Sequence, residues 1–251
     1  MNLPWRVVWI TGASTGIGAE IARQLAVQGV MVATSARKID VLLAAAKAEA
    51  NLKPYPLDVT NAENVASVFT QIEQDLGSID LVIAAAGTYA PLAIDNFKAE
   101  MFQTAYQVNY LGVINVLAAI LPVFRARKSG HISWIASVAG YIGLPQAGSY
   151  GPTKAALINL AECLQPELAV AGIATSIINP GFVKTPLTAQ NEFEMPFLMD
   201  VEEAARLTIA GLVKKKFEIA YPWQFVWILK TLQLLPYPWF FGLVRKFVVK
   251  Q

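Results

Sequence analysis

The amino-acid sequence predicts an α/β fold: a doubly wound parallel sheet with helices on both faces, followed by an aromatic-rich C-terminal helical tail. Three observations predict this fold. Apolar runs of strand length alternate with longer segments of helical period, Gly and Pro residues stand where the runs end, and aromatic residues become dense after residue 220. Because repeated strand–helix–strand units give parallel sheets covered on both faces, we expect a single domain at residues 1–220 and a helical extension at 221–251.

The predicted elements alternate from the start of the chain. Short apolar strands are expected at residues 6–11, 30–35, 55–57, 81–84, 131–136 and 174–178. Helices are expected between them, at residues 18–28, 40–50, 61–75, 99–127 and 150–171. In an open α/β sheet the loops that follow the strands gather at one edge, so ligand contacts are expected near Gly12, Gly87, Gly140, Pro180 and Gly181.

Composition excludes several classes of function. The 251 residues include 20 basic and 18 acidic ones, and this net charge of +2 provides no general attraction for nucleic acid. Cys163 and His131 are the only residues of their kinds, so no internal disulfide, no Cys/His zinc site and no metal are expected. The first residues lack a signal-peptide pattern, and we expect a cytoplasmic protein. Mean hydropathy is high at +0.44, although no run of 18 apolar residues is present.

A glycine-rich turn, Thr11-Gly-Ala-Ser-Thr-Gly-Ile-Gly18, follows the first strand and opens the first helix. Gly12 and Gly16 let the backbone approach a pyrophosphate, and Gly18 lets the helix pack closely on the strand. The helix N-terminus adds free amides and the positive end of its dipole. The turn therefore predicts a dinucleotide site with contacts from Gly12, Ser14, Thr15, Gly16, Ile17 and Gly18.

The end of the second strand predicts which dinucleotide is bound. An NAD site usually has a carboxylate there for the ribose 2′-hydroxyl, whereas an NADP site needs cations for the 2′-phosphate. Arg37 and Lys38 occupy this place, so NADP(H) is the predicted cofactor, with Ser14 as a further hydroxyl donor. Asp58, which precedes Val59 after the third strand, is expected to accept from the adenine amino group, to cap the helix near residue 61, or to do both.

Tyr150 and Lys154 form a pair with a direct chemical interpretation. Residues at i and i+4 share one helix face, so the Lys154 ammonium is expected close to the Tyr150 phenol. A free phenol has a pKa of ~10, and a neighbouring cation favours the phenolate and lowers that pKa. The pair therefore predicts an acid/base unit, with Ser137 upstream as a hydroxyl group beside it.

In this order, the glycine turn, Asp58, Ser137, Tyr150 and Lys154 resemble the motifs of the short-chain dehydrogenases/reductases over residues 6–185. The resemblance implies a Rossmann-like domain that binds NADP(H) and catalyses the reaction. It implies that Asn109 is a fourth catalytic residue and that residues 179–185 flank the nicotinamide. The cofactor contacts implied outside the turn are Arg37, Lys38, Asp58, Val59, Ala86, Gly87, Asn109, Tyr150, Lys154, Pro180, Gly181, Val183 and Thr185.

The same resemblance implies a role for each catalytic side chain. Tyr150 delivers or removes the proton on the substrate oxygen, and Ser137 donates a hydrogen bond to that oxygen. Lys154 lowers the pKa of Tyr150 and binds the nicotinamide ribose, and Asn109 holds a water that connects Lys154 to solvent. The structural alternatives are that Ser137 caps a turn and that Asn109 only bonds backbone inside its helix.

One motif departs from the family pattern. Members commonly carry Asn-Asn-Ala-Gly after the fourth strand, whereas this chain reads Ala84-Ala-Ala-Gly87. The two Asn side chains usually tie the sheet to neighbouring loops, so their replacement by Ala84 and Ala85 removes those ties. Gly87 is still expected to admit the cofactor.

The C-terminal extension is apolar and basic. It holds nine aromatic residues, and its only charges are the cations Lys230, Arg245, Lys246 and Lys250. From residue 239 to 250 apolar side chains cluster on one helical face with most cations opposite, and Pro236 and Pro238 are expected to break the preceding segment from this helix. The pattern is typical of a helix in a membrane interface, so residues 223–251 are predicted to contact the inner face of a membrane peripherally. A homodimer interface and a lid over the substrate cleft are the alternatives.

The predicted function is hydride transfer between NADP(H) and the carbonyl or alcohol group of a hydrophobic, lipid-like substrate. The substrate class is inferred from the aromatic tail and from residues 186–199, which occupy the family's variable substrate loop. The apolar residues of that loop are Leu187, Phe193, Met195, Phe197, Leu198 and Met199. The alternatives are a non-catalytic NADP-binding sensor, which has no chemical need for the four catalytic residues, and an epimerase or dehydratase on the same scaffold.

Overall fold

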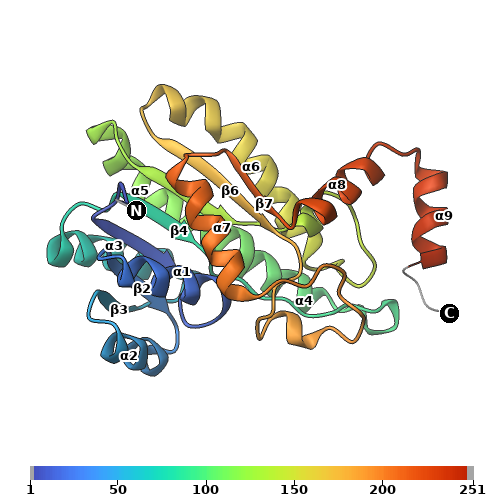
Figure 1. The fold of residues 1–251 in the computed structure, drawn as a ribbon, viewed down its shortest axis with the longest axis horizontal. Helices are drawn as coiled ribbons and strands as arrows, with labels where there is room; N and C mark the ends of the chain where they lie inside the picture. The colour runs from blue at the N-terminus through green and yellow to red at the C-terminus, as the bar shows by residue number, and fades with distance from the viewer. Residues whose placement is uncertain (1–2, 248–251) are drawn as a thin grey trace.

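The computed structural model describes residues 3–247 and has a central sheet between two layers of helices (Figure 1). Within these residues, seven parallel strands pair in the order β3-β2-β1-β4-β5-β6-β7. The strands are β1 (Val7–Thr11), β2 (Met31–Ala36), β3 (Leu52–Pro56), β4 (Leu81–Ala84), β5 (His131–Ile135), β6 (Ala174–Pro180) and β7 (Glu218–Tyr221). The order reverses between β1 and β4, and open α/β sheets bind ligands at the carboxyl ends of the strands beside such a reversal.

Helices cover both faces of the sheet, as predicted. α1 (Gly16–Val27), α2 (Ile39–Ala48) and α7 (Val201–Val213) pack on one face, and α3 (Ala62–Leu76), α5 (Gly112–Arg127) and α6 (Gly151–Val170) pack on the other. Successive strand residues supply opposite cores: Trp9 and Val82 lie in the core with α3 and α5, whereas Ile10 and Ile83 lie in the core with α1 and α7. The central strands are therefore apolar on both faces, which explains their continuous apolar runs.

A long helical run, Ala99–Arg127, joins β4 to β5. It consists of α4 (Ala99–Ala105), a π-helical segment η2 (Tyr106–Leu111) and α5. Among the described residues this run alone is long and apolar enough to cross a membrane by length and composition. However, Val116, Ile120 and Phe124 are fully buried in the core that also contains α3, so the apolar side of the run is used inside the protein.

The structure corrects several predicted boundaries. The strand expected at 55–57 begins at Leu52, whose side chain is buried, and β6 continues to Pro180. α7, β7 and the wide π turn were absent from the predicted pattern. The π turn could not be seen there, because one wide turn inside a helix leaves the apolar periodicity almost unchanged. The predicted break of the tail is confirmed, since helix is absent at residues 233–236 and Pro236 directly precedes α9 (Tyr237–Phe247). Pro238 itself lies in the first turn of α9, where a helix needs no amide donor. Val248 and Lys250 of the predicted tail helix lie outside the described residues.

The C-terminal extension leaves the β7 edge of the sheet and forms α8 (Trp223–Leu232) and α9 (Figure 1). Phe225, Val226 and Leu229 of α8 pack with Val138, from the turn after β5, in a small separate core. α9 lies farther out, and within it only Phe240 is buried. The extension therefore begins beside the loop that carries Ser137.

We expect Phe124→Ala to lower the free energy of unfolding by about 3–5 kcal/mol, because this fully buried ring would leave a cavity between α5 and the sheet. Val170→Ala, at the exposed end of α6, is the matched control and should change it by less than about 0.5 kcal/mol. Urea unfolding monitored by circular dichroism measures both. Equal midpoints for the two variants would contradict the core position of α5.

Candidate active site

The carboxyl ends of the strands open into a cleft of about 2090 Å³. Pockets for a single small molecule usually measure about 300–1,000 Å³, so this cleft has room for a dinucleotide together with a substrate. Every predicted site residue except Asn109 lines it. Asn109 is fully buried behind the cleft wall. The fold thus gathers side chains from six separate loops into one place.

The glycine turn after β1 has the geometry of a phosphate cradle. Gly12 has a φ of +68°, and a Cβ on it would lie 2.5 Å from the Ala86 amide nitrogen. A Cβ on Gly18 would lie 2.7 Å from the Gly12 carbonyl oxygen, so α1 packs directly on the turn. Thr15 precedes α1 without a side-chain cap, and the first turn of α1 has no acidic residue. Its free amides and dipole therefore suit an anion, and the residues present fit a dinucleotide phosphate.

Arg37 and Lys38 lie at the end of β2, with both side chains exposed at the edge of the cleft. Asp58, after β3, accepts hydrogen bonds from the Thr60 amide (2.9 Å) and hydroxyl (2.8 Å). These bonds hold the pKa of Asp58 below its ordinary value, and the charge of Arg37 contributes in the same direction. The edge of the cleft thus combines two exposed cations with one carboxylate whose pKa is lowered.

The predicted capping role of Asp58 is wrong. The side chain of Asn61 caps α3 by accepting a hydrogen bond from the Asn64 amide at 2.9 Å. Asp58 instead closes a short turn with Thr60 and keeps its place in the lining of the cleft.

The loop after β4 is tied down without the usual Asn side chains. The Ala85 amide donates to the Thr11 carbonyl at 3.2 Å, and the Ala86 amide lies 3.4 Å from the Thr11 hydroxyl. Asn109 clamps the next part of the loop, since its Oδ1 accepts from the Thr88 amide (2.7 Å) and its Nδ2 donates to the Thr88 carbonyl (3.0 Å). Neighbouring elements therefore supply the ties that Ala84 and Ala85 do not.

Asn109 also binds outside its own helix, contrary to the alternative expected for it. It lies in the π-helical segment η2, and its Nδ2 donates a third bond, to the Thr153 hydroxyl of α6 at 3.1 Å. The side chain thus joins the β4 loop to the helix that carries Lys154.

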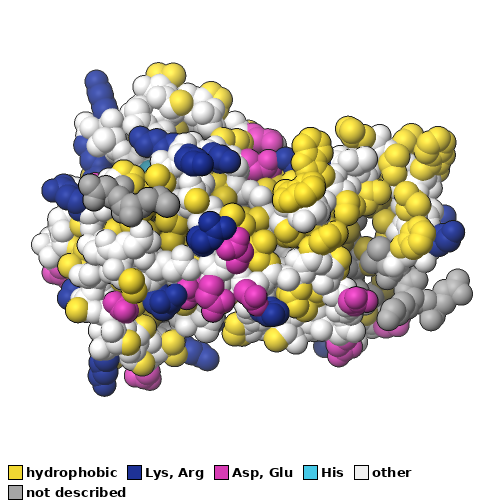
Figure 2. All heavy atoms as spheres, viewed as in Figure 1, with side chains coloured by type: hydrophobic (Ala, Val, Ile, Leu, Met, Phe, Trp, Pro, Cys, Tyr) yellow, Lys and Arg dark blue, Asp and Glu magenta, His cyan; other side chains and the backbone are white. Residues whose placement is uncertain are grey.

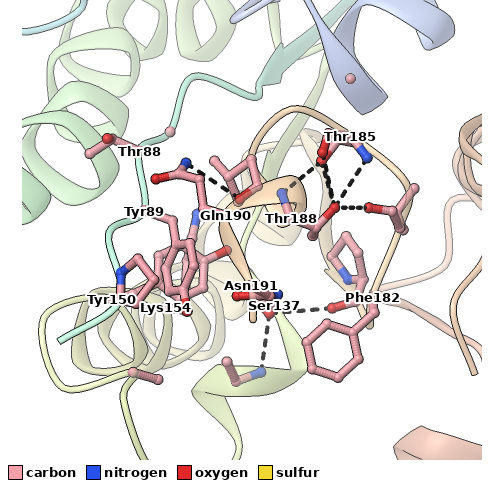
Figure 3. A pocket seen from close by; sticks show the side chains of 18 of the residues that line it. Thr88, Tyr89, Ser137, Tyr150, Lys154, Phe182, Thr185, Thr188, Gln190 and Asn191 are labelled. Carbon is pink, nitrogen blue, oxygen red and sulfur yellow. Dashed lines mark hydrogen bonds between the residues drawn. The ribbon is translucent and has the colours of Figure 1, made fainter. Parts of the chain in front are cut away.

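Tyr150 and Lys154 lie together as predicted, at the start of α6 (Figure 3). The Lys154 Nζ is 5.3 Å from the centre of the Tyr150 ring and donates to the Ile135 carbonyl at 2.9 Å. Burial lowers the pKa of Lys154 to about 7. Burial also raises the pKa of Tyr150 to about 12, and a hydrogen bond with Ser137 opposes this rise only in part. In this structure desolvation of the phenol dominates the pKa of Tyr150. The expectation that Lys154 lowers this pKa stays a prediction.

Ser137 has two roles in the structure. Its Oγ accepts from the Ala139 amide at 3.1 Å, so the residue caps the short helix η3 (Val138–Gly140), as the structural alternative expected. The same hydroxyl donates to the Pro180 carbonyl at 3.3 Å and lines the cleft beside Tyr150 (Figure 3). Capping thus fixes the hydroxyl at the cleft wall.

The substrate side of the cleft contains residues that the sequence did not single out. Tyr89 packs edge-on against Tyr150 with 5.2 Å between the ring centres. Leu187 and Phe193 of the predicted substrate loop line the cleft, but so do Glu192 and Glu194. The position of Tyr89 two residues after Gly87 was the available signal, although only the fold shows its contact with Tyr150.

Glu218 anchors the tail to this side of the cleft. Its carboxylate accepts from the Tyr141 hydroxyl at 2.5 Å and from Asn179 Nδ2 at 3.0 Å, and it pairs with Lys230 of α8. Tyr141 follows η3 directly, so one partly buried network joins α8 to the Ser137 turn. Glu218 is the last acidic residue of the chain, but nothing in the sequence identifies its partners.

No group of three or more potential metal ligands occurs within residues 3–247. The titratable and hydroxyl side chains that line the cleft beside its dinucleotide-sized space include Tyr150, Lys154 and Ser137.

Comparison with known proteins places this geometry in a family. The sequence matches the family model described as short chain dehydrogenase over residues 6–195. An uncharacterized oxidoreductase of Myxococcus xanthus is 34% identical over 249 residues, which cover 98% of each chain.

Two solved structures extend the comparison. The alcohol dehydrogenase of the archaeon Thermococcus sibiricus, complexed with 5-hydroxy-NADP, has a TM-score of 0.76 and 27% identity, and the match covers 86% of this chain and 95% of that one. A short chain dehydrogenase/reductase of Burkholderia phymatum in complex with NAD has a TM-score of 0.83 and 22% identity, and the match covers 92% and 93%. The second likeness shows the fold alone.

The buried lysine predicts a specific dependence of stability on pH. Because the pKa of Lys154 falls to about 7 on folding, the unfolded chain binds more protons than the folded protein between about pH 7 and about pH 10. The contribution of this group to stability therefore rises with pH in that window, by at most ~1.4 kcal/mol per pH unit. Urea unfolding at several pH values should show wild type gaining stability relative to Lys154→Met.

The control is Tyr150→Phe, because the raised pKa of Tyr150 affects stability only above about pH 10. Its difference from wild type should stay constant across the window. A constant difference for Lys154→Met as well would contradict the burial of a titrating lysine.

Proposed function

The chain belongs to the short-chain dehydrogenase family, and on that premise we propose that it is an NADP(H)-dependent oxidoreductase that interconverts a carbonyl and an alcohol on a hydrophobic substrate. The observation that carries the proposal is the meeting of Tyr150, Lys154 and Ser137 in the cleft that also holds the glycine turn. A binding-only protein would have no chemical need for a buried lysine beside a half-buried phenol, since burying an ammonium costs free energy.

The residues at the strand ends are proposed to hold the cofactor. Gly12 and the first amides of α1 would receive the pyrophosphate. Gly87 has no side chain, and a Cβ on it would lie 3.8 Å from the Lys154 Nζ, so it leaves space beside that ammonium group. When bound, the nicotinamide supplies or accepts the hydride at the substrate carbon. Lys154 and Pro180, which both line the cleft, would orient the nicotinamide end.

Tyr150 is proposed to exchange a proton with the substrate oxygen. Its pKa of about 12 keeps the phenol protonated near neutral pH, so it is prepared to donate to the oxygen of a carbonyl that is being reduced. Ser137 would donate a second hydrogen bond to the same oxygen as negative charge develops there. Lys154, with a pKa of about 7, can resupply the proton.

Asn109 is proposed to act as a positioning residue. Its amide is already engaged by Thr88 and Thr153, so it keeps the β4 loop and α6 at a fixed separation. The water that the family resemblance implies for Asn109, connecting Lys154 to solvent, stays a prediction.

Arg37 and Lys38 support NADP(H) over NAD(H). They are the cations at the end of β2, and a guanidinium matches the oxygens of a 2′-phosphate with two parallel hydrogen bonds. The Thermococcus protein is complexed with 5-hydroxy-NADP and the Burkholderia protein with NAD, so the choice here depends on these side chains.

A hydrophobic substrate is supported by the apolar side chains that line the cleft. They include Leu187, Phe193, Phe225 and Leu229, and Tyr89 packs edge-on against Tyr150. The carboxylates of Glu192 and Glu194 also line the cleft and would disfavour an acidic substrate.

We place the protein in the cytoplasm, with its apolar tail toward the inner face of a membrane.

We expect Tyr150→Phe to lower the turnover of NADPH-dependent ketone reduction by about 100- to 10,000-fold, because the phenol that donates the proton is lost. The dissociation constant of NADPH, followed by fluorescence, should change little. Tyr55→Phe, whose hydroxyl meets Asp75 far from the cleft, is the control and should keep near-normal turnover. Near-normal turnover in Tyr150→Phe would refute the role of the phenol.

Arg37→Ala should weaken NADPH binding by about 10- to 100-fold, as expected for the loss of charge-assisted bonds to a phosphate, and should leave NADH binding unchanged. Lys47→Ala, an exposed cation in the last turn of α2, is the control for net charge. Titration of both nucleotides against both variants measures the preference. An equal loss for NADPH and NADH would show that Arg37 does not read the 2′-phosphate.

A further inference from the structure

The helices of the tail each have an inner face toward the cleft and an exposed outer surface. On α9, Phe240 is only 5% exposed, and it lines the cleft together with Val244. Trp239 and Phe241, on the two flanks of that inner face, are 69% and 51% exposed. The centre of the apolar face thus turns toward the cleft, which corresponds to the lid alternative, while aromatic surface remains uncovered on both sides.

α8 repeats this arrangement. Phe225 and Leu229 point inward and line the cleft, whereas Trp223 and Trp227 are about two-thirds exposed, at 68% and 67%. Figure 2 shows the result: hydrophobic side chains gather over α8 and α9 on the face seen there. Large exposed apolar patches of this kind mark sites of interaction with protein or membrane.

This surface is held in place rather than loosely attached. Lys230 of α8 pairs with Glu218, which also accepts from Tyr141 beside the Ser137 turn. The Lys230 Nζ lies 5.1 Å from the centre of the Tyr141 ring. The inner face of α8 is therefore fixed relative to the reacting groups, so whatever contacts its outer face is brought near the cleft.

Charge indicates which partner covers the patch. Arg245 and Lys246 of α9 are exposed, and no acidic residue follows Glu218 in the chain. A symmetric homodimer through this patch would place the same surface against itself and bring like charges together. An anionic lipid surface instead supplies the opposite charge for the cations and an interfacial region for the Trp side chains.

We propose that α8 and α9 form a membrane-facing rim of the cleft: their outer faces dock on an anionic bilayer surface, and their inner faces receive a lipid-like carbonyl substrate directly from that bilayer. The inference rests on the proposed function for its substrate step and on the exposed aromatic and cationic residues for its docking step. The two steps can be tested separately.

The docking step is tested by co-sedimentation of the full chain with vesicles of phosphatidylcholine, with and without phosphatidylglycerol. Wild type should bind the anionic vesicles, and the triple variant Trp223→Ser/Trp227→Ser/Trp239→Ser should bind them at least about tenfold less. Arg245→Gln/Lys246→Gln should lose only the preference for phosphatidylglycerol. Val170→Ser, which changes one exposed apolar residue at the far end of α6, is the control and should bind like wild type.

Equal partitioning of wild type and the triple variant would overturn the docking surface. So would a concentration-dependent dimer, measured by analytical ultracentrifugation, that the triple substitution abolishes without any vesicle binding by wild type. In that case a second copy of the chain is the occupant.

The entry step is tested with two ketones, a short water-soluble one and a long-chain one embedded in the anionic vesicles. The triple variant should reduce the soluble ketone within about twofold of wild type and the embedded ketone at least about tenfold more slowly. An equal rate loss on both ketones would overturn the entry route. If wild type reduces neither ketone but still sediments with the vesicles, the proposed function fails and the docking surface stands.

Discussion

The structure depends on the close approach of β1 and β4 at their carboxyl ends. A Cβ on Gly12 would lie 2.5 Å from the Ala86 amide nitrogen, so these two loops have no room for a side chain between them. This contact sets the floor of the cleft, and Gly18 packs directly on it, since a Cβ there would lie 2.7 Å from the Gly12 carbonyl oxygen. The free amides of α1 are thereby directed into the cleft, where a cofactor phosphate would need them.

Beside this floor, two titratable side chains are desolvated close to each other. Lys154 is buried with a depressed pKa, and Tyr150 is half-buried with a raised pKa, so desolvation favours the neutral form of both groups. Such perturbed pairs cluster at functional sites, because proton transfer near neutral pH needs them. The bonds from Asn109 to Thr88 and Thr153 keep the surrounding elements from relaxing to relieve that desolvation.

The tail adds a second constraint on the same cleft. Because Glu218 ties α8 to the turn after Ser137, the apolar wall of the cleft and the exposed aromatic surface belong to the same two helices. The choice between a lid and a membrane anchor is then not exclusive, since the inner face of α9 serves one purpose and its flanks are free for the other. An interfacial helix normally buries the centre of its apolar face in lipid. In α9 the residue at that centre, Phe240, is instead buried against the protein.

The sequence by itself determined the doubly wound sheet and nearly all of the site, because apolar periodicity and glycine positions are local and because the loops after parallel strands must meet at one edge. Gly12 and Arg37 could be found in this way, Tyr150 and Lys154 from their helical spacing, and Ser137 through the family resemblance. Only the tertiary structure decided the protonation of Tyr150, the real cap of α3 at Asn61, the use of Asn109 as a clamp and the anchor at Glu218. Each of these depends on desolvation or on partners far away in the chain, which no local pattern records.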